Sequence, residues 1–100
     1  MEVDLKSKTI TSANILEVKC GTNTPCGGDT GHGGKTIFRL IDHGGTDWCL
    51  KILDHQRKII DVNGPESITI EFGGDCEADT FIEALEYAIK IFNAQRTLRI

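Results

Sequence analysis

The residues best suited to binding chemistry lie in one segment, residues 21–36, which reads GTNTPCGGDTGHGGKT. It contains six glycines and no large apolar side chain. Glycines allow backbone N–H groups to approach an anion closely, and successive N–H groups form a concave nest for it. Threonine hydroxyls, an amide and cationic side chains add further donors. The expected ligand-binding residues are Thr22, Asn23, Thr24, Gly27, Gly28, Asp29, Thr30, His32, Lys35, Thr36 and Arg39.

The length of this loop also needs an explanation. Structureless connections of this length are uncommon in compact domains and are usually functional or disordered. Ordering the loop costs about 1–2 kcal/mol per residue in backbone entropy, and the segment offers little apolar burial to offset that cost. Three interpretations remain open: a flexible loop without a ligand, a loop that binds a small molecule or nucleotide, and a loop that contacts a partner protein.

Two nucleotide-binding motifs are excluded. Gly34-Lys35-Thr36 matches the end of a P-loop, but Asp29 stands where the first glycine should be. The residues that follow, 37–41, have the pattern of a strand, whereas both the P-loop and the dinucleotide-binding fingerprint lead into a helix.

Catalysis and metal binding have weaker support in the loop. Cys26 and His32 could form a nucleophile and base, with Asp29 orienting the histidine, but nothing in the sequence fixes that geometry. Five residues separate Cys20 from Cys26, whereas structural zinc sites favour two to four between paired cysteines. We therefore expect no catalytic residues, no metal and no cofactor.

Composition limits the classes of partner. The chain has 100 residues, 39% of them hydrophobic, and a net charge of −4. We expect one domain, residues 1–100. An acidic chain is unsuited to binding duplex DNA. No apolar run has the length of a membrane helix, and the N-terminus lacks the pattern of a signal peptide, so we expect a cytoplasmic protein with reduced cysteines.

The pattern predicts an α+β fold, with a mostly antiparallel sheet of about five or six strands and one C-terminal amphipathic helix. The expected strands are residues 2–10, 13–20, 36–41, 48–53, 57–62 and 67–72. Gly44-Gly45 predicts a hairpin between the third and fourth strands.

The helix is expected to begin near Asp75 as its cap, or one turn later at Thr80. Its apolar stripe consists of Phe81, Ala84, Leu85, Ala88 and Phe92. Ile82, Ile89 and Ile91 make the stripe wider than one small sheet needs, which predicts a second contact and a homo-oligomer.

The run from Gly21 to Thr36, together with the turn Phe72-Gly73-Gly74-Asp75, resembles a segment of small uncharacterised bacteriophage and prophage proteins. Compact phage proteins of this size include inhibitors of host defence that sequester nucleotide-type signals. The resemblance implies an anti-defence role in the host cytoplasm and transfers no residue roles.

These observations predict a non-enzymatic protein whose loop binds a small phosphate-bearing ligand of the nucleotide-signal type. The alternative is a protein-interaction or assembly subunit without a small-molecule ligand.

Overall fold

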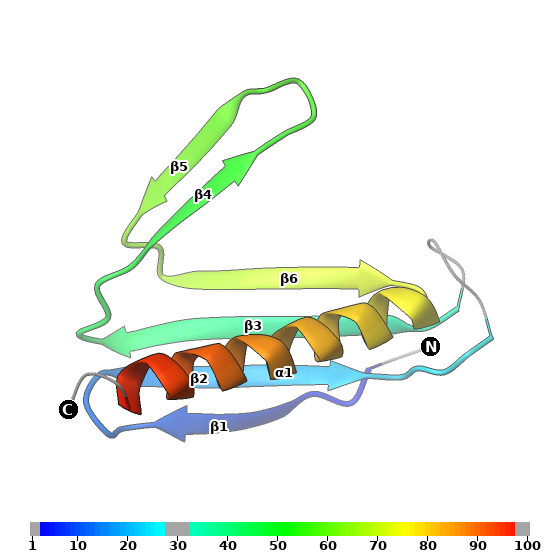
Figure 1. Ribbon diagram of the computed structural model, residues 1–100, viewed down its shortest axis with the longest axis horizontal. Helices are drawn as coiled ribbons and strands as arrows, with labels where there is room; N and C mark the ends of the chain where they lie inside the picture. Colours follow the sequence, from blue (N-terminus) through cyan, green and yellow to red (C-terminus); the bar gives the residue numbers. More distant parts are fainter. Residues whose placement is uncertain (1–2, 28–32, 98–100) are drawn as a thin grey trace. The chain divides into compact units, whose positions relative to one another are not determined.

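The computed structural model describes residues 3–27 and 33–97 and contains six strands and one helix in them (Figure 1). The strands are β1 (Lys6–Ile10), β2 (Ile15–Thr22), β3 (Lys35–Gly44), β4 (Cys49–Leu53), β5 (Ile59–Asn63) and β6 (Ser67–Gly73), and the helix is α1 (Asp75–Thr97). The α+β class predicted from the sequence is confirmed.

The strands form two sheets rather than the single sheet that we expected. Four of them pair in the order β1-β2-β3-β6, and β4 pairs with β5 alone. Within the larger sheet, β1 and β2 are antiparallel, with Lys6 opposite Cys20 and Ile10 opposite Leu16.

The predicted hairpin between β3 and β4 is wrong. The backbone N–H of Asp42 on β3 donates to the carbonyl of Glu66, just before β6, at 2.9 Å, so β6 takes the place expected for β4. The Asp42 carboxylate accepts hydrogen bonds from the N–H groups of Gly44 and Thr46, and Gly45 has a positive φ of 82°. This turn ends β3 and directs the chain out of the sheet.

The β4–β5 hairpin has one wholly apolar face. Its register places Leu50 opposite Val62 and Ile52 opposite Ile60, and residues directly opposite each other in an antiparallel pair point to the same face. On the other face Lys51 pairs with Asp61 at 3.2 Å. At the turn, the Asp54 carboxylate accepts hydrogen bonds from two backbone N–H groups.

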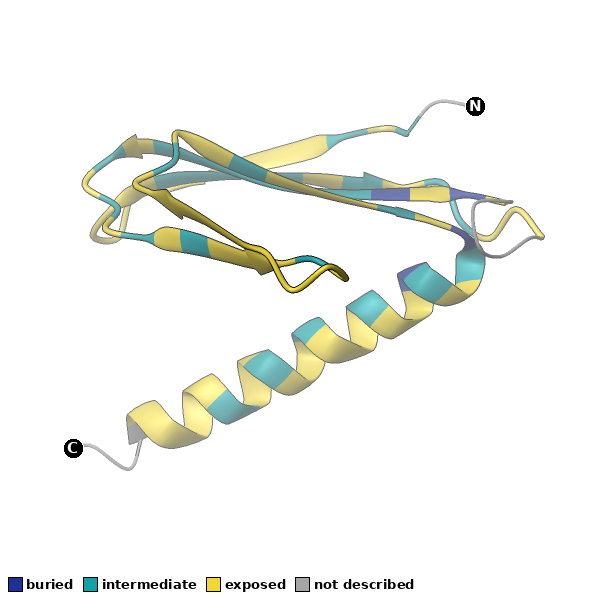
Figure 2. Cartoon of the chain, turned by 90° about the horizontal axis from the view of Figure 1, so that it is seen from above, coloured by how far each residue is buried: buried dark blue, intermediate teal, exposed yellow. Residues whose placement is uncertain are grey.

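The chain divides into two compact units. One contains residues 22–36 and 72–100, and therefore the loop and α1; the other contains residues 4–21 and 37–71. Among the described residues, Ala78 on α1 is the single buried hydrophobic residue, and Thr36 at the start of β3 is the buried polar one. Figure 2 shows how much of the described surface is exposed, including most of α1.

Candidate functional site

The described part of the loop is held by a carboxylate of the protein itself. Asp75, the first residue of α1, accepts hydrogen bonds from the backbone N–H of Cys26 at 2.9 Å and from that of Gly27 at 2.6 Å. A third N–H, that of Gly34, donates to the same carboxylate at 3.3 Å. The backbone N–H of Gly74 returns a bond to the Gly34 carbonyl at 2.8 Å. We call this arrangement the Asp75 anchor.

The Asp75 anchor has the chemistry expected of an anion nest. Three amide donors from both ends of the loop converge on one carboxylate, and bonds of this kind to an ionised acceptor are stronger than neutral ones. Gly27 adopts φ 89°, a left-handed conformation that favours glycine and here aims its N–H at Asp75. The backbone amides at the two ends of the loop thus converge on a carboxylate of the chain itself, that of Asp75.

A hydroxyl and amide network joins the two ends of the loop. The Thr22 hydroxyl lies 2.8 Å from that of Thr36 and 2.9 Å from that of Thr24. The Asn23 side-chain oxygen accepts a hydrogen bond from the Lys35 backbone N–H at 2.7 Å. These side chains, which the sequence predicts as ligand-binding, bond to one another and to the backbone.

Gly34 is required by close packing in this network. A Cβ atom at this position would lie 2.5 Å from Cγ2 of Thr24 and 2.7 Å from Oδ1 of Asn23. Real Cβ atoms essentially never approach other heavy atoms that closely, so any side chain here would push the loop away from β3.

The predicted ligand-binding residues fall into three groups. Six of them, Thr22, Asn23, Thr24, Gly27, Lys35 and Thr36, lie in the same compact unit. Arg39 lies in the other unit, where its Nε donates to the Thr69 hydroxyl on β6 at 3.0 Å. Gly28, Asp29, Thr30 and His32 lie outside the described residues. The Cys26 thiol donates to the Asn23 carbonyl at 3.1 Å.

Asp75 is the residue whose role the sequence did not indicate. Its place after Gly73-Gly74 was interpreted as a helix cap, and α1 does begin there. Nothing in the local pattern pairs it with amides 41 to 49 residues away.

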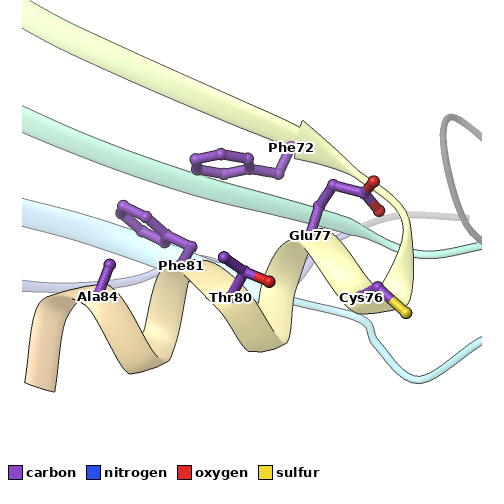
Figure 3. Close-up of a pocket in the computed structure, with 6 residues that line it drawn as sticks. All are labelled: Phe72, Cys76, Glu77, Thr80, Phe81 and Ala84. Carbon is purple, nitrogen blue, oxygen red and sulfur yellow. The ribbon is translucent and has the colours of Figure 1, made fainter.

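An open cavity of about 460 Å³ lies between the end of β6 and the first turns of α1. The described residues that line it are Phe72, Cys76, Glu77, Thr80, Phe81 and Ala84. The rings of Phe72 and Phe81 lie toward one another, with their centroids 4.6 Å apart. The Cys76 sulfur points away from them (Figure 3). These lining residues include an acidic side chain and no lysine or arginine, so they offer no cation to a phosphate.

Two further features concern residues 3–27 and 33–97. No cluster of three or more histidine, cysteine, aspartate or glutamate side chains there could hold a metal ion. No helix in the described ranges has the length and apolar character needed to cross a membrane.

Comparisons with protein-family models, with curated proteins and with solved structures give no match to this chain.

Proposed function

We propose that this chain is a non-enzymatic assembly subunit that functions as a homo-oligomer. The observation that carries the proposal is the exposure of large apolar side chains on α1. Ile82, Ile89 and Phe92 keep 45%, 58% and 63% of their surface exposed. Scattered exposed apolar residues need no explanation, but apolar residues gathered on one surface mark a site of protein contact.

The Asp75 anchor supports this function over ligand binding. Its three described amide donors already bond to a carboxylate fixed in the same unit. A phosphate would have to displace that carboxylate or use other donors. The anchor therefore acts in this proposal as a structural tie between the loop and the first turn of α1.

The β4–β5 hairpin gives independent support. A two-stranded hairpin is marginally stable in water unless its apolar face packs against something. Its apolar face includes Ile52, Ile60 and Val62, and all three are exposed. An assembly subunit has a use for such a surface, whereas a small monomeric ligand carrier does not.

A second candidate function is binding of a small phosphate-bearing ligand, such as the nucleotide-type signal that a phage anti-defence protein would sequester. The convergence of loop amides on one anionic position favours it, together with Lys35 beside that loop. Isothermal titration with a panel of cyclic and linear nucleotides separates the two candidates. Saturable heat that Lys35→Ala weakens would establish ligand binding, and we expect none.

Sedimentation equilibrium at micromolar concentrations tests the leading proposal. We expect a mass that is a multiple of the 11.0 kDa chain. A single species of 11.0 kDa over the whole concentration range would reject it.

A further inference from the structure

Four apolar residues of α1 follow the spacing of a coiled-coil seam. Ile82, Leu85, Ile89 and Phe92 are separated by three, four and three residues, which is the spacing of heptad positions that face a partner helix. Leu85 is half-buried and the other three are exposed. We call these four residues the outer seam.

The apolar residues of α1 that pack within its own unit lie at its first turns, before most of the outer seam. Phe81 contacts Phe72 at the end of β6 through its ring, and Ala78 is buried. Further along the helix, three of the four outer-seam residues, Ile82, Ile89 and Phe92, are exposed.

The charges of α1 indicate what covers the seam. The first half carries five acidic residues, Asp75, Glu77, Asp79, Glu83 and Glu86, and the second half carries Lys90 and Arg96. Two parallel copies of this helix would place like charges together. Two antiparallel copies place the basic end of each beside the acidic end of the other, and also oppose the two helix dipoles favourably.

The spacing of the seam fits the same orientation. When Ile82 of one copy lies opposite Phe92 of the other and Leu85 lies opposite Ile89, a two-fold axis passes at the level of Tyr87, and both halves of the contact become identical. Arg96 of each copy then lies beside the acidic first turns of its neighbour, near Asp79. A helix of this length, about 34 Å, gives room for the whole seam.

We propose that two copies of this chain associate through the outer seam, with their α1 helices antiparallel. This inference rests on the proposed function and specifies its partner and contact. The partner is a second copy because the charges along the helix are complementary to those of an antiparallel copy.

The test compares two substitutions on α1 by sedimentation equilibrium. Ile89→Lys places a charge in the seam and should weaken self-association roughly thirtyfold or more. The matched control is Tyr87→Lys, because Tyr87 is 66% exposed and lies on the opposite side of the helix. It should leave association unchanged. Phe92→Ser serves as a second seam variant, and circular dichroism confirms that each variant is folded.

The orientation is tested by charge reversal. Arg96→Glu should weaken association a few-fold at low salt, and adding Asp79→Lys should restore it. Arg96→Glu without effect, or without restoration, would reject the antiparallel arrangement.

The outcomes separate this inference from the proposed function. A monomeric wild type overturns both. An oligomeric wild type that persists in Ile89→Lys and Phe92→Ser, or that Tyr87→Lys disrupts equally, overturns the outer seam alone and leaves the assembly function standing.

Discussion

At the scale of single residues, the loop depends on two positions, Asp75 and Gly34. Asp75 supplies the anion on which the amides of Cys26, Gly27 and Gly34 converge. Gly34 supplies the space that lets Thr24 and Asn23 lie against β3. Both requirements concern packing and hydrogen bonding inside the chain, so substitutions should affect stability directly.

Asp75→Ala should lower the free energy of unfolding by about 2–3 kcal/mol, because three N–H donors lose a charged acceptor. Urea unfolding measures the change. Glu83→Ala is the matched control, since Glu83 is an exposed acid on the same helix with no described bond to the loop and no part in the charge-reversal test. Equal effects of the two substitutions would show that the anchor adds nothing beyond the loss of an acidic side chain from α1.

Gly34→Ala should destabilise the protein by about 1–3 kcal/mol, because the added methyl group overlaps Thr24 and Asn23. Gly44→Ala is a suitable comparison, because the nearest atom to a Cβ there, Cδ1 of Ile15, lies at an ordinary 3.9 Å. A thermal denaturation midpoint that falls no further for Gly34→Ala than for Gly44→Ala would contradict this account of the loop.

The sequence showed which loop residues are special but not what they bind. Glycines, threonines and Asn23 predicted a nest of donors for a ligand, whereas the described bonds show three backbone amides converging on Asp75. The sequence did not predict the acceptor, Asp75, because it lies 41 to 49 residues further along the chain. The residues around Asp75 have the local pattern of an ordinary helix cap.

At the scale of elements, local patterns predicted the strands and the helix, while their pairing depended on distant contacts. The six strands and the start of α1 at Asp75 are confirmed. The hairpin expected at Gly44-Gly45 is wrong, because the bond from Asp42 to Glu66 brings in β6, a strand more than twenty residues away. Turn residues indicate where a strand ends but not which strand lies beside it.

A pair across the larger sheet predicts how stability depends on pH. The His43 ring on β3 lies 2.9 Å from the Glu17 carboxylate on β2, and this hydrogen bond holds the pKa of Glu17 below its ordinary value of 4.5. A lowered carboxyl pKa means that the folded state favours the charged form. The contribution of this pair to stability is present when the pH is above the pKa of Glu17 in the unfolded state. It is lost as the pH falls through the lowered pKa of Glu17 in the folded state.

Glu17→Gln should therefore unfold at a lower urea concentration than the wild type near neutral pH, and the difference should shrink below pH 4.5. Urea midpoints measured across the acid range check this directly. A difference that stays constant or grows as the pH falls would contradict the stabilising role of the Glu17–His43 pair.

At the scale of the whole molecule, the exposed apolar residues of each unit point to assembly. The outer seam of α1 and the apolar face of the β4–β5 hairpin both offer apolar side chains that a partner would cover. The sequence singled out Ile82, Ile89 and Ile91 as residues beyond what one sheet needs; Ile82 and Ile89 are exposed, whereas Ile91 is half-buried. It could not show that the hairpin stands as a separate two-stranded sheet, because that again depends on how β3 and β6 pair.

Native mass spectrometry after gentle purification tests the central claim most directly, because it reports subunit number and bound small molecules together. We predict a complex whose mass is a whole-number multiple of the 11.0 kDa chain, without an added small-molecule mass. A single chain of 11.0 kDa that carries a co-purified phosphate-bearing molecule would contradict the assembly function and establish the ligand-binding one.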